Sequence, residues 1–220
     1  MASTYPVTVD LYRRIIDMGV LAEDTLTELS GRWDLESKRN AAVAAWERES
    51  GWHPFVSTGV DSTRYFDAPE SKYLELSAGL LSVTTVLTGY SLTSAGTVQT
   101  VNDDFYLEER GAPDRGWPYT ALRFGAFQSG DPRSIVVTGK WGFCAVDSFP
   151  DDAFDAILDD ALCRCYGQLA LAVSRGVASI RDLSSSVDYG GGKGGPFSGA
   201  QDAWRKNWQR TAEQFKRPSI

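Results

Sequence analysis

The stretch IVVTGKWGFCAVDSFPDDAFDAILDDALCRCYGQLAL, residues 135–171, contains the transition that decides the fold. It opens with β-branched residues, which are typical of a strand, and an aromatic–glycine turn follows them. Pro150 then breaks the pattern, and beyond it apolar residues recur at the spacing of an amphipathic helix. The sequence therefore predicts a last β-strand that leads into a long helix.

The predicted helix has an apolar stripe and several carboxylates off that stripe. The stripe consists of Phe154, Leu158, Ala161, Leu162, Cys165 and Leu169, with Ile157 beside it. Asp151 and Asp152 occupy the first turn, where negative charge complements the helix dipole. Asp155 and Asp159 are i, i+4 neighbours. We expect a solvated acidic face, because a catalytic or metal site needs facing carboxylates from a second element.

Upstream of this helix, short β-branched or aromatic segments alternate with Gly, Pro, Asn and Asp. Such spacing is typical of a small antiparallel sheet or open barrel. The predicted strands are KYLEL (72–76), LLSVTTVL (80–87), GTVQTV (96–101), DFYLEE (104–109), YTALRF (119–124) and SIVVTGKW (134–141).

The N-terminal region predicts a helical hairpin. Thr8 resembles an N-cap, Leu11 and Ile15 follow at helical spacing, and Gly19 ends the run. An alanine-rich helix is expected from near Ser37 to the Ser50–Gly51 pair.

The C-terminal region predicts a linker and a separate amphipathic helix. Residues 183–199 are rich in Ser and Gly, and Ser198-x-x-Gln201 is a capping-box pattern. The following helix places Trp204, Trp208 and Phe215 on one face and carries the basic side chains of Arg205 and Arg210. A helix of this kind either folds back on its own domain or docks in a groove of a partner.

These elements predict an α+β fold. A helical core is formed by residues 1–54 and by the long helix within 147–182, and a β insert covers residues 55–146. A Gly/Ser-rich linker follows at 183–199, and a docking helix follows at 200–220.

The composition excludes several classes of protein. A net charge of −7 and a sequence pI of about 4.8 argue against a protein that binds nucleic acid by neutralising phosphates. The sequence predicts neither a signal peptide nor a membrane span. Three cysteines in no disulfide framework are typical of a reducing compartment.

The remaining chemical motifs favour structural interpretations. Cys163-x-Cys165 points its two thiols to different sides of a helix, which disfavours a shared metal, and the single histidine, His53, lies in a turn. GGGKGG (190–195) is similar to a phosphate-binding loop but lacks Ser or Thr after the lysine. We therefore predict no catalytic, cofactor or metal site. A sugar-binding platform of Trp117, Tyr119 and Trp141 is an alternative, although such aromatic residues are more often core or interface residues.

Several short motifs, in this order, resemble the head–tail adaptor (connector) proteins of long-tailed bacteriophages and gene transfer agents. They are WERESGWHPF (46–55), STRYFD (62–67), LLSVTTV (80–86), DFYL (104–107) and VTGKWGF (137–143) followed by Pro150. The resemblance covers roughly residues 11–173, and the long β insert and Gly-rich tail depart from it.

The resemblance implies a structural virion protein that is assembled in the host cytoplasm. It would form a ring, usually of twelve subunits, between the portal protein and the head-closure (stopper) or tail terminator protein, and DNA would pass through its lumen.

We expect the C-terminal helix to bind the portal through Trp204, Trp208, Phe215, Arg205 and Arg210. Asp151, Asp152, Asp155 and Asp159 would line the lumen or a subunit boundary, and Trp117 and Trp141 would contact neighbouring subunits or the next neck protein. Another neck protein, or a carbohydrate-binding β module, is the alternative.

Overall fold

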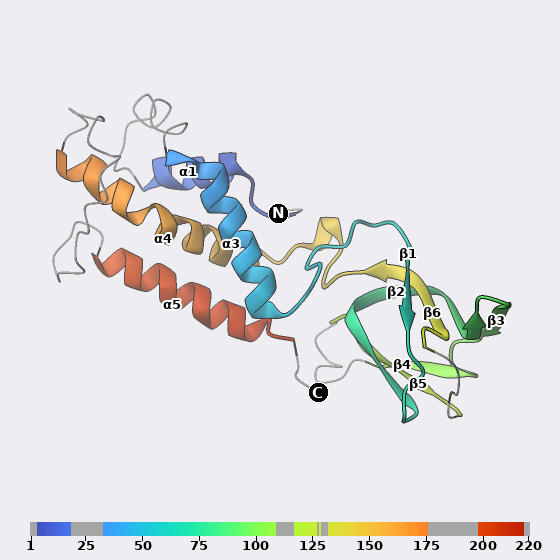
Figure 1. Cartoon of the computed structure of the whole chain (residues 1–220). Coiled ribbons are helices and arrows are strands. Elements are labelled where there is room, and N and C mark those ends of the chain that lie inside the picture. Colours follow the sequence, from blue (N-terminus) through green and yellow to red (C-terminus); the bar gives the residue numbers. More distant parts are fainter. Residues whose placement is uncertain are drawn as a thin grey trace. The chain divides into compact units, whose positions relative to one another are not determined.

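The computed structural model describes residues 4–18, 33–108, 117–126, 128, 132–175 and 198–217. The fold is α+β, with helices and an inserted antiparallel sheet (Figure 1). The chain forms two compact units. We call residues 1–50 and 150–216 the helical unit, and residues 51–149 and 217–220 the β unit.

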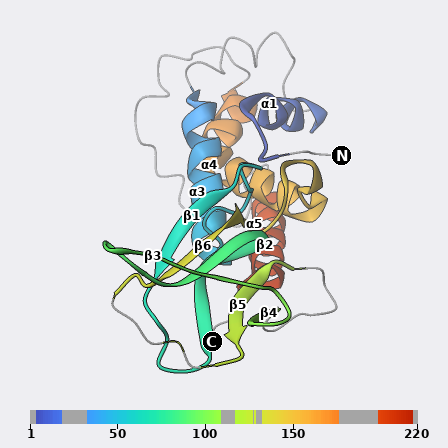
Figure 2. The same cartoon turned by 90° about the vertical axis from the view of Figure 1, so that its right-hand side faces the viewer.

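The described part of the helical unit contains four helices. They are α1 (Thr8–Asp17), α3 (Leu35–Ser50), α4 (Asp151–Arg175) and α5 (Ser198–Gln214). Helix α4 packs against α1, α3 and α5, and α3, α4 and α5 lie side by side in both views of Figures 1 and 2. No helix in the described ranges is both long and apolar enough to cross a membrane.

Local chemistry fixes the ends of the first two helices. The N-cap of α1 is Val7 rather than the predicted Thr8, and the Asp10 carboxylate accepts a hydrogen bond of 2.8 Å from the Val7 amide. Leu11 and Ile15 are buried, as their spacing predicts. Helix α3 ends before Gly51, whose φ of +73° is the left-handed conformation that commonly follows a helix.

The apolar stripe predicted for α4 is confirmed. Its members are buried except Phe154, which is half-buried. The neighbouring Ala153 and Ala156 are also buried, as are Ala42 and Ala45 of α3. Small side chains on both helices allow close packing between them.

The β unit contains one six-stranded antiparallel sheet. Its strands are β1 (Ser62–Phe66), β2 (Tyr73–Ser91), β3 (Ser94–Gln99), β4 (Phe105–Glu108), β5 (Tyr119–Phe124) and β6 (Ile135–Trp141). The strand order is β1-β6-β2-β5-β4, and β3 pairs with β2. A short 3-10 turn, η2 (Val146–Ser148), precedes Pro150 and α4.

Two strands predicted separately, at 72–76 and 80–87, are a single long strand, β2. Tyr73–Glu75 and Leu80 pair with β5, and the region from Leu80 onwards also pairs with β6 and then β3. The register shifts between Glu75 and Leu80, so the strand bends instead of ending. The small residues at 77–79 resemble a turn in the sequence, but they form the bend.

The side chain of Arg217 binds at this bend. Its guanidinium donates a hydrogen bond of 2.9 Å to the carbonyl oxygen of Ser77 and another to that of Leu76. It also lies over the ring of Trp52, 5.6 Å from the ring centre. Arg217 thus donates hydrogen bonds to backbone carbonyl groups of β2 at the point where its register with β5 shifts.

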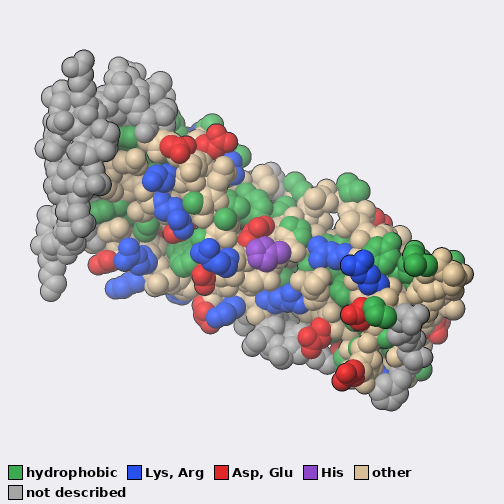
Figure 3. Space-filling model, viewed as in Figure 1, with side chains coloured by type: hydrophobic (Ala, Val, Ile, Leu, Met, Phe, Trp, Pro, Cys, Tyr) green, Lys and Arg blue, Asp and Glu red, His purple; other side chains and the backbone are tan. Residues whose placement is uncertain are grey.

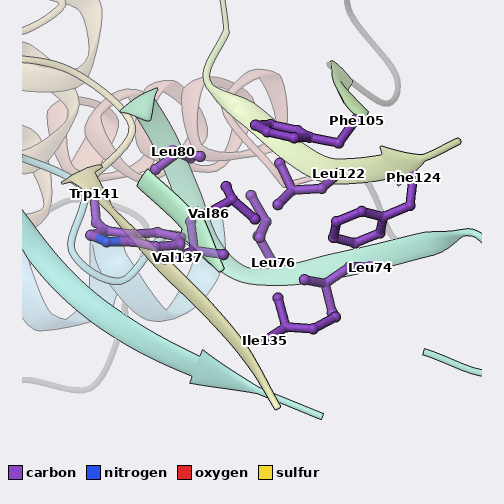
Figure 4. Close-up of a cluster of buried hydrophobic side chains, with 11 residues drawn as sticks. Leu74, Leu76, Leu80, Val86, Phe105, Leu122, Phe124, Ile135, Val137 and Trp141 are labelled. Atoms are coloured by element: carbon purple, nitrogen blue, oxygen red, sulfur yellow. The ribbon is translucent and has the colours of Figure 1, made fainter. Parts of the chain in front are cut away.

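The core of the β unit lies on one face of the sheet (Figure 4). It is built from inward-facing side chains of β2, β4, β5 and β6. They include Leu74, Leu76, Leu80, Val86, Phe105, Leu122, Phe124, Ile135, Val137 and Trp141. The alternation of Ile135 and Val137 with Val136, which is not in this cluster, follows the period of two expected of a strand.

Candidate functional site

Helix α5 packs against its own helical unit, one of the two outcomes expected for an amphipathic C-terminal helix. It contacts α4 along its length and also reaches α3. Thr211 and Ala212 are buried, and Trp204 and Trp208 are half-buried one helical turn apart. The apolar stripe of α5 is therefore largely covered by the chain itself. The linker expected at 183–199 lies almost wholly outside the described residues.

An aromatic contact joins the end of α5 to α3. The ring centres of Phe215 and Trp46 are 5.7 Å apart, with an interplanar angle of 59°. Trp46 is fully buried, whereas Phe215 is half-buried. Phe215, expected on the sequence to bind a partner, thus has a partner within its own chain.

The exposed side of α5 is basic. Arg205, Lys206 and Arg210 are exposed, and Arg210 donates a hydrogen bond of 3.1 Å to Asn207. On the face shown in Figure 3, Lys and Arg side chains over the helical unit lie beside Asp and Glu rather than forming a patch of one sign. A polar groove of about 360 Å³ runs between α4 and α5; it is lined by Asp152, Asp155, Asn207, Arg210, Thr211 and Gln214.

Asp159 does not belong to a solvated acidic face, which corrects the expectation for this residue. Its side chain is buried, and Asn207 of α5 donates a hydrogen bond of 2.7 Å to it. Arg14 of α1 forms an ion pair with it at 3.8 Å. Asp151, Asp152 and Asp155 are exposed, as expected. Asp159 is buried because α5 covers a side of α4 next to the apolar stripe.

Burial dominates the electrostatics of Asp159. Desolvation raises the pKa of its carboxyl group, while the hydrogen bond from Asn207 and the charge of Arg14 act in the opposite direction and Asp155 adds to the rise. The folded state therefore holds this proton more tightly than the unfolded state does. Its contribution to stability is present at low pH and is lost as the pH rises through the raised pKa.

We expect Asp159→Asn to be at least as stable as the wild-type chain at neutral pH, with any advantage disappearing in acid, where the carboxyl group is protonated. Asp159→Ala should instead lose about 1–3 kcal/mol, because it leaves the Asn207 amide without its acceptor. Urea unfolding across a pH series measures both effects. The control is Asp202→Asn on the exposed side of α5, with an expected change within about 0.5 kcal/mol. A stabilising effect of Asp159→Asn that grows in acid would contradict the prediction.

The cysteines have the character of packed thiols. Burial raises the pKa of Cys144 to about 12 and those of Cys163 and Cys165 to about 11. Cys165 is fully buried on the apolar stripe, as expected. Within the described part of the chain, no group of His, Cys, Asp and Glu side chains could hold a metal ion. His53 is exposed in the turn after α3.

The aromatic residues proposed as a sugar platform do not form an exposed surface. Trp141 is 3% exposed; its indole donates a hydrogen bond of 2.9 Å to the Ser62 carbonyl, and Arg64 lies 4.5 Å from its ring centre. Trp117 packs edge-on against Trp52 and Phe143. We expected Trp141 to contact a neighbouring subunit or another neck protein, but almost none of its ring is exposed in this chain.

The exposed apolar residues of the β unit lie elsewhere. They are Val60, Tyr65, Tyr73, Leu92, Val98, Val101, Tyr106 and Val146. Tyr65 and Tyr90 are in ring contact at 5.7 Å and line a pocket of about 230 Å³ with Leu92, Pro132 and Arg133. None of the sequence motifs predicted this surface. The sequence does indicate it in one respect, since residues 76–102 contain no charged side chain.

Comparison of the sequence with protein-family models and with curated proteins finds no match. Among solved structures, the chain is similar to a chain from the neck of an empty gene transfer agent particle, computed with sixfold symmetry. The similarity covers 99% of this chain and 92% of that chain, with a TM-score of 0.51 and 14% sequence identity. At this identity the similarity shows a shared fold.

Proposed function

We propose that this chain is a structural protein of a virion neck, namely a head–tail adaptor. The observation that carries the proposal is the shared fold with a chain of a particle neck over nearly the whole length of both. The adaptor-like motifs at 46–55, 62–67 and 137–143 lie within the aligned length and support the same assignment. The chain would work through contacts between proteins.

In this proposal the chain forms a ring below the portal protein and receives the stopper or tail terminator on its other side. The sixfold symmetry of the related particle neck supports a ring, and twelve subunits are compatible with that symmetry. The net charge of −7 favours a lumen that does not retain DNA as it passes. The exposed Asp151, Asp152 and Asp155 are our candidates for that lumen or for a subunit boundary.

We assign portal binding to the exposed basic side of α5. Arg205 and Arg210 are free of the packing that holds Trp204 and Trp208 against the helical unit. The tryptophans then act mainly by holding α5 in position, and their exposed edges add apolar contact area. A change of charge on the exposed side tests binding, and because Arg210 also donates a hydrogen bond to Asn207, urea unfolding of the variant checks that the packed side is intact.

We expect Arg205→Glu/Arg210→Glu to weaken binding to the portal protein at least tenfold, which corresponds to about 1.4 kcal/mol. Size-exclusion chromatography with light scattering, on the chain alone and mixed with a candidate portal protein from the same genome, measures the complex. Arg13→Glu/Arg48→Glu reverses two exposed charges on α1 and α3 and serves as the matched control. Equal loss in both double variants would show that net charge, not α5, governs the interaction. No complex with wild-type chain would refute the adaptor assignment.

A stopper or head-completion protein is the second candidate, because the related structure is described as a particle neck and not as an adaptor. The same experiment separates the two. An adaptor binds the portal directly, whereas a stopper binds only after the adaptor ring is in place.

A further inference from the structure

One half of the sheet ends in two open edges. There the strand order is β1-β6-β2-β3, because β2 pairs with β6 on one side and with β3 on the other. In the described part of the chain, no strand pairs with the outer edge of β1 or of β3. Each outer edge therefore offers backbone N–H and C=O groups to another strand.

The β3 edge carries no charged side chain and no proline, although Gly96 in its middle has a left-handed φ of +77°. Exposed edge strands are usually protected by charged side chains, especially Lys, by Pro or by bulges. β3 has the sequence SAGTVQ and pairs with β2 without a register shift. The hairpin of β2 and β3 projects from one end of the sheet, and Leu92 at its turn is fully exposed (Figure 1). An uncharged open edge in a chain with 23% charged residues indicates a surface that is paired in the working assembly.

An apolar row crosses this half of the sheet. The register pairs Tyr65 of β1 with Val136 of β6, Val136 with Leu87 of β2, and Leu87 with Val98 of β3. Cross-strand partners lie on the same face, so these four side chains form one row. Val136 in the middle is 5% exposed, whereas Tyr65 and Val98 at the two ends are 50% and 65% exposed. The row is thus uncovered at the two positions where a neighbouring sheet would extend it.

The strand directions favour a second copy of this chain as that neighbour. All neighbours in the order β1-β6-β2-β3 are antiparallel, so β3 runs opposite to β1. Placing β1 of a second copy beside β3 continues the antiparallel alternation without a break. β1 has five residues and β3 has six, so their lengths match. This contact uses a different edge on each copy, and repeating it gives a ring when the rotation between copies closes.

We propose that β3 of one subunit pairs with β1 of the next, with Val98 beside the neighbour's Tyr65, to form a sheet that is continuous around the ring. The inference rests on the proposed ring and specifies its subunit interface. The backbone provides the hydrogen bonds, and the aromatic and β-branched side chains determine the register.

Charge placed at the two ends of the row tests this pairing. Val98→Lys and Tyr65→Lys, each alone, should weaken self-association of the full chain at least tenfold. The double variant Val98→Glu/Tyr65→Lys should restore most of it, because the carboxylate introduced on β3 would face the ammonium group introduced on β1 of the next subunit. Within one chain these two positions are three strand spacings apart, roughly 14 Å, so a restored contact must be between chains. Leu92→Lys in the hairpin turn is the control and should change self-association less than twofold.

Sedimentation velocity over a concentration series measures self-association of the chain alone, and electron microscopy counts subunits on the portal protein. If Val98→Lys forms the same rings as the wild type, or if the Glu/Lys double variant is as weak as the single variants, strand pairing is wrong while the adaptor assignment stands. If the wild-type chain self-associates, the single variants weaken this and the double variant restores it, but the wild type does not bind the portal protein, the pairing stands and the adaptor assignment fails. If it neither self-associates nor forms a ring on the portal, the pairing is refuted.

Amide hydrogen exchange provides a second readout without substitutions. Pairing should slow exchange in β1 and β3 at least tenfold on assembly, and should leave the buried β6 unchanged. Unchanged exchange in β3 within assembled rings would overturn the proposal.

Discussion

A Gly139→Ala variant is expected to lose about 3 kcal/mol or more of the stability of the β unit. Gly139 lies in β6, which pairs with β1 on one side and β2 on the other. A Cβ atom at this position would lie 2.1 Å from the Ser82 carbonyl oxygen and 3.0 Å from the Leu80 side chain. The first contact is with backbone, which cannot rotate away as a side chain can. One added methyl group therefore separates the two central strands of the sheet.

Urea unfolding followed by amide exchange in β2 and β6 measures this loss for the β unit separately. Gly167→Ala on the exposed side of α4 is the matched control, because it makes the same chemical change where a Cβ atom meets nothing within 4 Å. Helix propensity predicts that this variant gains roughly 0.5–1 kcal/mol. The two substitutions should thus have opposite signs. A Gly139→Ala chain as stable as the wild type would show that β6 is not held between β1 and β2 as described.

Periodicity predicted the parts of this fold in which one side of an element faces one core. The helical spacing of the residues from Leu158 to Leu169 predicted the face through which α4 packs, and these residues are buried. The alternation of Ile135 and Val137 likewise follows the period of a strand, and both side chains are buried. Such patterns depend only on local spacing, so they do not depend on which element provides the other half of the core.

The errors arose where a second contact changed the environment of a residue. Asp159 lies off the main stripe of α4, but α5 covers that position and provides Asn207 as a donor. The bend of β2 resembled a turn, because small residues at 77–79 suit either structure and only the pairing with β5 and β6 distinguishes them. Long-range pairing of this kind is not encoded in local spacing.

The surfaces were harder to predict than the core. Aromatic density suggested Trp117 and Trp141 as contact residues, but Trp141 is packed within its own unit. The row from Tyr65 to Val98 joins four strands whose alignment depends on register, which a single sequence does not reveal. Its only local sign was the absence of charge in residues 76–102.

Helix α5 packs against its own helical unit, and Trp46 is the residue that tests how its end is held there. We expect Trp46→Ala to lose about 3–5 kcal/mol of the stability of the helical unit, because it removes a fully buried indole and leaves a cavity. It also removes the ring against which Phe215 packs at the end of α5. Amide exchange in α4 and α5, combined with circular dichroism during urea unfolding, measures the loss and its location.

The controls for Trp46 separate packing from helix propensity. Arg48→Ala, two residues along α3 and exposed, should change stability by no more than about 0.5 kcal/mol, since its ion pair with Glu49 is on the surface. Trp46→Phe should lose less than Trp46→Ala, because it keeps an aromatic ring near Phe215. If α5 exchanges as slowly in Trp46→Ala as in the wild type, its position depends on α4 alone. If instead α5 becomes fast-exchanging while α4 remains protected, the contact between Trp46 and Phe215 is what holds the end of α5 against the helical unit.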